Sequence, residues 1–288
     1  MYTIVLPIRK EGIESFFTLN VPLYKKYLNS TEVKRFIFIT PSNSVEILKS
    51  YCSELLEFNY EVIADESFLD KILINEHGWV KQMLIKLLVS DIIDTDYYFL
   101  IDDDMFLTQP LSFSDMFVEG KIIYSNESWT DDGINFATNT RWWNGSCKLL
   151  DYDINIIINS HSNMGVTPQL MITSEVQKMI SSLHSLYDDD WKKRFVDYGA
   201  TEYASYWIHL LKTKKSSLYT PNGKKMFTMN HTRNVLVPGL SQHEVENIIS
   251  QAFTDKSEFF SVVQSWIGYP KNWYTHIINK HLNVKKQT

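Results

Sequence analysis

The chain has 288 residues, of which 44% are hydrophobic and 14% aromatic, so it can bury the core of one large domain or of two small ones. Its formal net charge of −6 argues against a basic face for DNA or RNA, and we expect no nucleic acid partner. The two cysteines, Cys52 and Cys147, have no metal-binding spacing and fit a reducing compartment.

We expect no targeting or membrane-spanning segment in this sequence. The apolar run over residues 1–8 is too short for a secretion signal and is followed at once by charge. No stretch reaches the ~20 apolar residues that a transmembrane helix needs. We therefore expect a cytoplasmic protein. Its basic end, residues 285–288, is expected to be a solvated tail, with weak contact to a membrane surface as the alternative.

The first hundred residues alternate between strand and helix patterns. Strands are predicted over residues 3–6, 35–40, 60–64 and 97–101, and helices over about 13–28, 44–56 and 79–89. Strands separated by helices require right-handed crossovers, which produce a mostly parallel sheet. The sequence therefore predicts an α/β fold with a Rossmann-like, mostly parallel central sheet flanked by helices.

From about residue 121 the pattern becomes irregular and richer in aromatic residues. One more strand is predicted over residues 121–125, and a helix is predicted over 174–186. Trp129, Trp142 and Trp143 lie in a polar stretch, where they can cover the core or stack against a sugar. We expect the core position for at least two of the three. This half is predicted to be irregular and rich in helices.

The strongest chemical signal is an apolar run over residues 97–101 that ends at three consecutive carboxylates, Asp102, Asp103 and Asp104. Such a run is typical of a strand buried on both faces, and these strands deliver their carboxyl ends to the ligand crevice of open α/β sheets. Two carboxylates at ~5 Å and an effective dielectric of about 20 repel each other by roughly 3 kcal/mol. Mg²⁺ or Mn²⁺ would offset this repulsion, because it takes oxygen ligands and keeps positions for phosphate oxygens.

Strand geometry suggests which acids share the metal. Side chains alternate along a strand, so Asp102 and Asp104 would share one side while Asp103 points to the other. If the strand continues that far, Asp102 and Asp104 are the metal pair. The alternative is a solvated acidic turn. A second acidic run, residues 188–190, follows a helix and is predicted to be solvated.

The known backbone cradles for phosphate are missing. Neither the Gly-x-Gly-x-x-Gly fingerprint nor the Gly-x-x-x-x-Gly-Lys-Ser/Thr loop occurs, so a metal and side chains would have to hold phosphates. Gln82 and Lys86 lie four residues apart on the polar face of the predicted helix 79–89. Lys86 is either within reach of a diphosphate or a solvated surface lysine.

Glu202 opens a further predicted helix, capped by Gly199 or Thr201. A carboxylate in the first turn is favoured by the helix dipole, which is a structural explanation. The functional alternative is a general base or an acid that orients a hydroxyl group.

Together these residues resemble GT-A glycosyltransferases. More narrowly, they resemble poorly characterised glycosyltransferase-like proteins of surface-glycan gene clusters and of large viruses. The similarity is densest over residues 78–110 and extends thinly over about 3–210. It rests on a first strand ending in Pro7, on Gly78-Trp79 with Gln82 and Lys86, on Leu100-Ile101-Asp102-Asp103-Asp104 with Phe106 and Pro110, and on Thr201-Glu202-Tyr203.

The resemblance implies one continuous GT-A domain with two halves. Residues 1–125 would form the Rossmann-like half that binds a nucleotide-sugar, and residues 126–288 the acceptor-binding and helical half. Asp102 and Asp104 would hold Mn²⁺ or Mg²⁺ on the diphosphate of the nucleotide-sugar. Asp103 would face the ribose or the reacting sugar.

Further site residues follow from the same resemblance. Pro7 and Arg9 would line the base and ribose, and Gln82 and Lys86 would complete the donor site. A late histidine often completes the metal shell in such enzymes. His231 is the first candidate for that ligand and His161 the second.

The implied reaction is transfer of a hexosyl or deoxyhexosyl group from a nucleoside-diphosphate-sugar to a glycan, glycoprotein or other hydroxyl acceptor. The metal would neutralise charge on the leaving diphosphate. Glu202 would act as base if configuration inverts, or would only orient the acceptor.

Two other classes stay open. A metal-dependent phosphatase or hydrolase also places Asp-x-Asp after an apolar strand, but that motif continues with Thr or Val where this chain has Phe106. A non-catalytic glycan-binding protein would explain the aromatic residues without explaining the acids.

Overall fold

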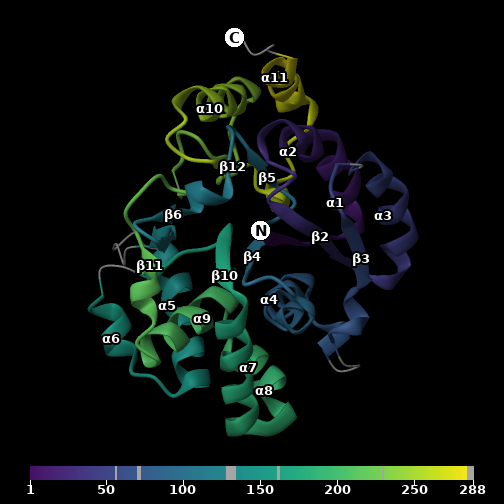
Figure 1. Ribbon diagram of the computed structural model, residues 1–288. Helices are drawn as coiled ribbons and strands as arrows, with labels where there is room; N and C mark the ends of the chain where they lie inside the picture. Colours follow the sequence, from purple (N-terminus) through teal and green to yellow (C-terminus); the bar gives the residue numbers. More distant parts are fainter. Residues whose placement is uncertain (56, 70–72, 128–133, 161–162, 229, 284–288) are drawn as a thin grey trace. The chain divides into compact units, whose positions relative to one another are not determined.

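The computed structural model of the protein describes residues 1–55, 57–69, 73–127, 134–160, 163–228 and 230–283 (Figure 1). The chain divides into two compact units that alternate along the sequence. Unit 1 contains Met1–Ile63, Ile101–Met116 and Lys224–Thr288, and unit 2 contains Ala64–Leu100 and Phe117–Gly223. Each unit therefore joins segments that are far apart in the sequence.

Unit 1 is built on the strands β1 (Tyr2–Pro7), β2 (Val33–Thr40) and β3 (Tyr60–Ala64), which are neighbours in that order. β1 and β2 are parallel, and Pro7 lies opposite Ile39. All of β1 is buried, as expected for a strand covered on both faces. The backbone N–H of Ile101 donates to Val5 at 3.2 Å, so the residue before the acidic run lies beside β1.

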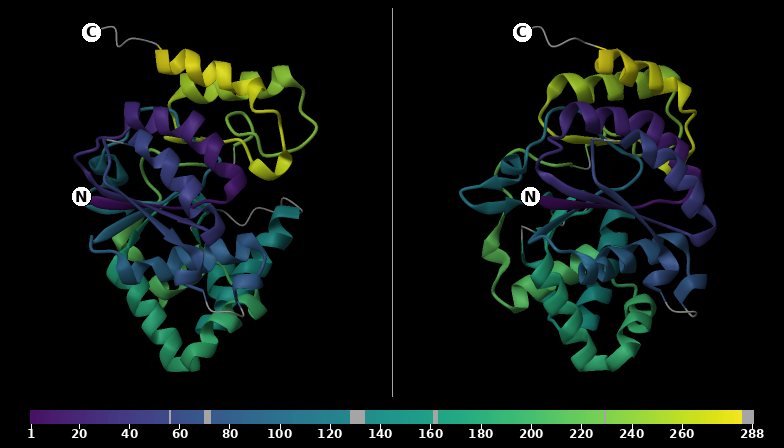
Figure 2. Two further views of the ribbon diagram at one scale, coloured as in Figure 1. Left: turned by 90° about the vertical axis from the view of Figure 1, so that its right-hand side faces the viewer. Right: turned by 45° about the vertical axis from the view of Figure 1, so that its right-hand side comes forward.

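The helices of unit 1 come from both ends of the chain. The predicted helix over 13–28 is one continuous helical stretch that contains a π-helical turn over Phe16–Asn20. Figure 2 shows α10 and α11 next to each other and close to α2, with which α11 is in contact. The α-helices of this unit are α1 (Lys10–Ser15), α2 (Val21–Tyr27), α3 (Val45–Cys52), α10 (Gln242–Asp255) and α11 (Asn272–Asn283).

A short antiparallel pair, β5 (Met105–Leu107) and β12 (Phe260–Val262), follows the acidic run. Phe106 of β5 is buried, and its ring stacks on Phe253 of α10 at 6.0 Å between centroids. A hydrophobic cluster therefore anchors the chain directly after the acids. Its buried members are Leu19, Leu23, Phe106, Val235, Val245, Ile249, Phe253, Val263, Tyr274, Ile277 and Ile278.

Unit 2 combines a strand pair with a group of helices that pack against one another (Figure 1). β4 (Tyr97–Leu100) and β10 (Gln169–Ile172) are antiparallel, with Gln169 opposite Leu100. The helices are α4 (Gly78–Leu88), α5 (Ile134–Leu150), α6 (Ile154–Ile158), α7 (Thr173–Tyr187), α8 (Trp191–Tyr198) and α9 (Glu202–Lys212). The short strands are β6 (Phe117–Val118), β7 (Lys121–Ile123), β8 (Asn126–Glu127), β9 (Asn163–Met164) and β11 (Tyr219–Thr220).

Short 3₁₀ turns join many of these elements. They lie at Ser42–Ser44, Ser53–Leu55, Asp65–Ser67, Leu73–Asn75, Val89–Ile92, Phe113–Met116, Asp188–Asp190, Ser216–Leu218 and Ser265–Ile267. The run Asp188–Asp190 contains no buried residue, as predicted for a solvated segment.

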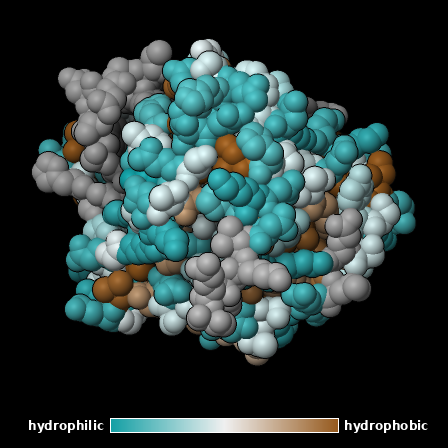
Figure 3. Space-filling view, turned by 90° about the horizontal axis from the view of Figure 1, so that it is seen from above, coloured by the Kyte–Doolittle hydropathy of each residue, from teal (hydrophilic) through white to brown (hydrophobic). Residues whose placement is uncertain are grey.

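The predicted fold class is confirmed: the protein is a mixed α/β structure with a mainly parallel central sheet and flanking helices. Of the three tryptophans, Trp143 is buried and Trp142 is half-buried against Trp79 at 5.6 Å, whereas Trp129 lies outside the described residues. No helix in the described ranges is both long and apolar enough to cross a bilayer. The face in Figure 3 is largely hydrophilic, with small separate hydrophobic areas.

The stack of Phe253 on Phe106 gives a stability prediction. Phe253→Ala should lower the free energy of unfolding by about 3–5 kcal/mol, because it removes a buried ring and leaves a cavity. Urea unfolding followed by circular dichroism measures this loss. Val237→Ala, at a site that is 40% exposed, should change stability by no more than about 0.5 kcal/mol. Equal effects of the two substitutions would contradict the assignment of this core.

Candidate functional site

The three acids form a turn. β4 ends at Leu100, and the backbone N–H of Met105 donates to the carbonyl of Asp102 at 3.3 Å. Side-chain alternation does not apply in a turn, so the geometric reason for pairing Asp102 with Asp104 is wrong. The assignment of these two residues as metal ligands stays a prediction. All three acids are half-buried, unlike a fully solvated acidic turn.

Asp103 is held by the first helical stretch of the chain. Asn20 donates its side-chain amide to the carbonyl of Asp103 at 2.8 Å, and Asn20 itself lies in the π-helical turn. π-helical turns inside α-helices are frequent at functional sites. A Cβ atom on Gly12 would lie 1.8 Å from Oδ2 of Asp103, so a larger residue at this position would require the carboxylate of Asp103 to move. Neither Asn20 nor Gly12 was predicted as a site residue, although a glycine inside a helical pattern is a signal in the sequence.

Asp104 is held by a segment far along the chain. Its Oδ2 accepts a hydrogen bond from the backbone N–H of Ser265 at 2.9 Å, and its carbonyl accepts one from Val263 at 3.2 Å. Ser265 is 161 positions away in the sequence, and no local pattern connects it to the acids. These contacts determine where the carboxylate of Asp104 lies.

The surroundings of the acids disfavour negative charge. Loss of hydration and, to a smaller extent, repulsion from Asp104 and Asp102 raise the pKa of Asp103 to about 7, while the positive charge of Arg9 lowers it. Loss of hydration and repulsion from Asp102 raise the pKa of Asp104 to about 6, although the bond from Ser265 lowers it. A cation bound here would relieve both effects.

The donor set of this turn suits a hard cation. Carboxylate oxygens are the ligands that Mg²⁺ and Mn²⁺ prefer, and raised pKa values are what such acids show without a cation. Within the described ranges no group of three or more His, Cys, Asp or Glu side chains is arranged to hold a metal. His231 lies in an exposed turn, and His161 lies outside the described residues.

The predicted donor-site residues of the first strand differ in exposure. Pro7 is buried at the end of β1, whereas Arg9 is exposed. Because Arg9 acts on the pKa of Asp103, the structure brings its charge close to the acids. Whether Pro7 and Arg9 line a nucleotide stays a prediction.

In unit 2 the structure brings together two predicted residues that are 116 positions apart, Lys86 of α4 and Glu202 of α9. Lys86 Nζ lies 3.2 Å from Glu202 Oε1 and 3.0 Å from Thr167 Oγ1. Lys86 and Glu202 are each only 4% exposed. The interpretation of Lys86 as a solvated lysine is therefore wrong, because a buried carboxylate draws its ammonium group inward.

The neighbours of this ion pair are polar and aromatic. Lys86 Nζ lies 5.4 Å from the ring centroid of Tyr203, whose hydroxyl is 2.9 Å from Thr167 Oγ1. Thr201 is the N-cap residue of α9, so Glu202 is in the first turn as predicted. Gln82 lies one turn before Lys86 on α4 and is half-buried. Thr167 was not singled out in the sequence, because it lies in no recognisable motif.

The sequence matches a protein family over residues 4–285, and the description of that family is "Family of unknown function (DUF6492)". A comparison with curated proteins finds no match.

Three solved glycosyltransferase structures are similar to this chain. Mouse xyloside xylosyltransferase 1 in its apo form has 10% identity and a TM-score of 0.48, with 93% of this chain and 99% of that chain covered. Galactosyltransferase LgtC with donor and acceptor sugar analogs has 10% identity and a TM-score of 0.43, with 99% and 97% covered. Mannosyltransferase Ktr4p from S. cerevisiae has 11% identity and a TM-score of 0.45, with 72% and 65% covered. These similarities assign no role to any residue of this chain.

Without metal, the free energy of unfolding should fall as the pH rises from about 5 to about 8. The native state keeps the protons of Asp103 and Asp104 up to pH values near about 7 and about 6, whereas unfolded carboxyl groups lose theirs near about 4. The native state therefore binds more protons in this window, and stability declines with pH. Urea unfolding in EDTA measures the slope. Asp104→Asn should reduce it, and an unchanged slope would contradict the coupling of these acids.

The buried ion pair gives a second stability prediction. Glu202→Gln should lower the free energy of unfolding by about 3–5 kcal/mol, because it removes the charge of a partner that lies 3.2 Å from the buried ammonium group of Lys86. The double variant Lys86→Met/Glu202→Gln should recover part of this loss. Glu57→Gln, at an exposed position, serves as the control. A loss below about 1 kcal/mol for Glu202→Gln would show that the pair is not a buried charge pair in solution.

Proposed function

The chain belongs to the family of unknown function DUF6492, and we propose that it is a metal-dependent glycosyltransferase of the GT-A type that uses a nucleoside-diphosphate-sugar. The observation that carries this proposal is the half-buried turn of three carboxylates after a buried strand. Two of these carboxylates have raised pKa values, so the turn is suited to a divalent cation. The sequence resemblance to GT-A enzymes is densest at this same segment.

We propose that Asp102 and Asp104 hold Mn²⁺ or Mg²⁺, with His231 as the candidate third protein ligand. The ion would supply Lewis-acid neutralisation of the leaving diphosphate. Asn20 and Ser265 would act as positioning residues, since they donate hydrogen bonds to the turn, and Gly12 leaves room for the carboxylate of Asp103.

Other residues of this chain would hold the donor. Arg9 carries a positive charge near the acids, where it can meet ribose or phosphate, and Pro7 ends the strand beneath it. Gln82 and Lys86 remain candidates for the donor site. For Lys86 this role would require exchange of its bonds to Glu202 and Thr167 for bonds to the diphosphate.

In the proposed reaction an acceptor hydroxyl oxygen forms a bond to the anomeric carbon of the donor. The bond from that carbon to the diphosphate oxygen breaks, and the nucleoside diphosphate leaves. If configuration inverts, Glu202 takes the proton of the hydroxyl group; if it is retained, Glu202 only orients the acceptor and the proton passes to the leaving diphosphate oxygen. Asp103 is the second candidate for a catalytic carboxylate. While Lys86 Nζ donates to Glu202, it holds that carboxylate in one orientation; this role and a bond of Lys86 to the diphosphate are alternatives.

The substrates are proposed at the level of class. The donor would carry a hexosyl or deoxyhexosyl group, and the acceptor would be a glycan, a glycoprotein or another hydroxyl compound. The surface-glycan or viral setting and the cytoplasmic location are also proposals. The basic tail lies outside the described residues beyond Asn283.

This function can be tested with a panel of nucleotide-sugars in the presence of Mn²⁺. The measurements are sugar transfer, hydrolysis of the donor and thermal stabilisation of the protein. Asp104→Asn should reduce turnover by at least about 100-fold, because it removes a charged ligand of the ion, and should leave the fold intact. Asp91→Asn, an exposed substitution of the same kind, should retain activity.

Three outcomes would overturn the proposal. An active Asp104→Asn variant would contradict the metal assignment. Release of inorganic phosphate without sugar transfer would indicate a phosphatase. Binding of glycans without metal-dependent binding of any nucleotide would indicate a glycan-binding protein.

A further inference from the structure

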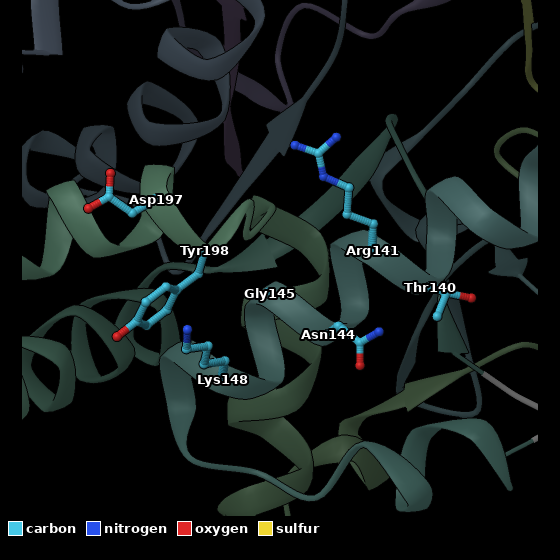
Figure 4. Close-up of a pocket in the computed structure, with 7 residues that line it drawn as sticks. All are labelled: Thr140, Arg141, Asn144, Gly145, Lys148, Asp197 and Tyr198. Carbon is cyan, nitrogen blue, oxygen red and sulfur yellow. The ribbon is translucent and has the colours of Figure 1, made fainter.

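A groove lined mainly by residues with polar or charged side chains lies on unit 2, between α5 and the end of α8 (Figure 4). Its volume is about 430 Å³, which is within the size range of small-molecule sites. The lining residues are Thr140, Arg141, Asn144, Gly145, Lys148, Asp197 and Tyr198.

The spacing along α5 explains how the groove forms. Arg141, Asn144, Gly145 and Lys148 follow the i, i+3, i+4, i+7 pattern, so they share one face of the helix. Figure 4 shows Arg141 and Lys148 on opposite sides of Gly145. A Cβ atom on Gly145 would lie 2.3 Å from the carbonyl oxygen of Tyr198, so glycine lets the end of α8 approach α5. The glycine therefore forms the floor between two cationic side chains.

Two of the lining side chains, those of Arg141 and Lys148, are cationic. Within the described part of the chain, neither Arg141 nor Lys148 forms an ion pair with a carboxylate. The one acid in the lining, Asp197, already accepts a hydrogen bond from Lys193. Lys148 Nζ lies 4.0 Å from the ring centroid of Tyr198, which fixes its place at the rim.

We propose that this groove binds a small anionic sugar, whose phosphate or carboxylate group contacts Arg141 and Lys148 and whose hydroxyl groups contact Asn144 and Thr140. Guanidinium and ammonium groups form charge-assisted hydrogen bonds to both kinds of oxyanion. The amide of Asn144 and the hydroxyl group of Thr140 suit sugar hydroxyls, and the apolar part of the lining can contact the carbon skeleton of a sugar. This site does not depend on the proposed transferase reaction.

Calorimetric titration of the full chain in EDTA, without nucleotide, tests the site. The probes are glucose 6-phosphate, glucuronate, inorganic phosphate and glucose. We expect glucose 6-phosphate or glucuronate to bind more tightly than inorganic phosphate and glucose. Tighter binding of glucose 6-phosphate would indicate that the site prefers a phosphate group, and tighter binding of glucuronate would indicate a carboxylate group. Arg141→Gln/Lys148→Gln should weaken binding by about tenfold or more, since two charge-assisted contacts are lost.

Two controls separate this site from other sources of binding. Lys192→Gln/Lys280→Gln changes the net charge equally but lies outside the lining, and should shift affinity by less than about twofold. Asp104→Asn should bind the sugar anion as the native chain does. No binding of any probe, equal binding by the Arg141→Gln/Lys148→Gln variant, or loss of binding in Asp104→Asn would each overturn the proposal.

Discussion

The repulsion among three neighbouring carboxylates is the constraint on which the candidate site depends. Asp102, Asp103 and Asp104 occupy successive positions in a turn that is only half exposed, so water screens their charges incompletely. The fold surrounds this turn with hydrogen-bond donors: the amide of Asn20 and the backbone N–H of Ser265. These two donors position the acids but carry no full charge, and the pKa of Asp103 stays raised although Arg9 lowers it. A bound cation would relieve the remaining repulsion.

The buried ion pair of Lys86 and Glu202 depends on the cost of removing charges from water. Lys86 and Glu202 are almost fully buried, and each ion on its own would be costly to remove from water. Their mutual contact, with Thr167 as a further acceptor, makes the burial tolerable. A charge pair held in this way favours one arrangement of α4 and α9 within unit 2. The groove at Gly145 shows the opposite situation, since Arg141 and Lys148 remain exposed and form no ion pair with an acid among the residues that the structure describes.

Several features could be predicted because they depend on local patterns. The strand before the acids was predicted over 97–101 and is observed over Tyr97–Leu100, and the helix predicted over 79–89 is observed over Gly78–Leu88. Hydrophobic periodicity indicates which residues face a core, and it can be recognised within a short stretch of consecutive residues. The burial of Lys86 could not be read in this way, because its partner is 116 residues distant.

The sequence alone determined the α/β alternation, the apolar strand and the three acids that end it, because each is a property of consecutive residues. Only the tertiary structure decided that these acids form a turn, that Gly12 and Ser265 lie against them, and that Lys86 pairs with Glu202. These contacts join segments that the chain separates widely. They arise from packing and from the need to satisfy buried polar groups, and neither is encoded in local periodicity.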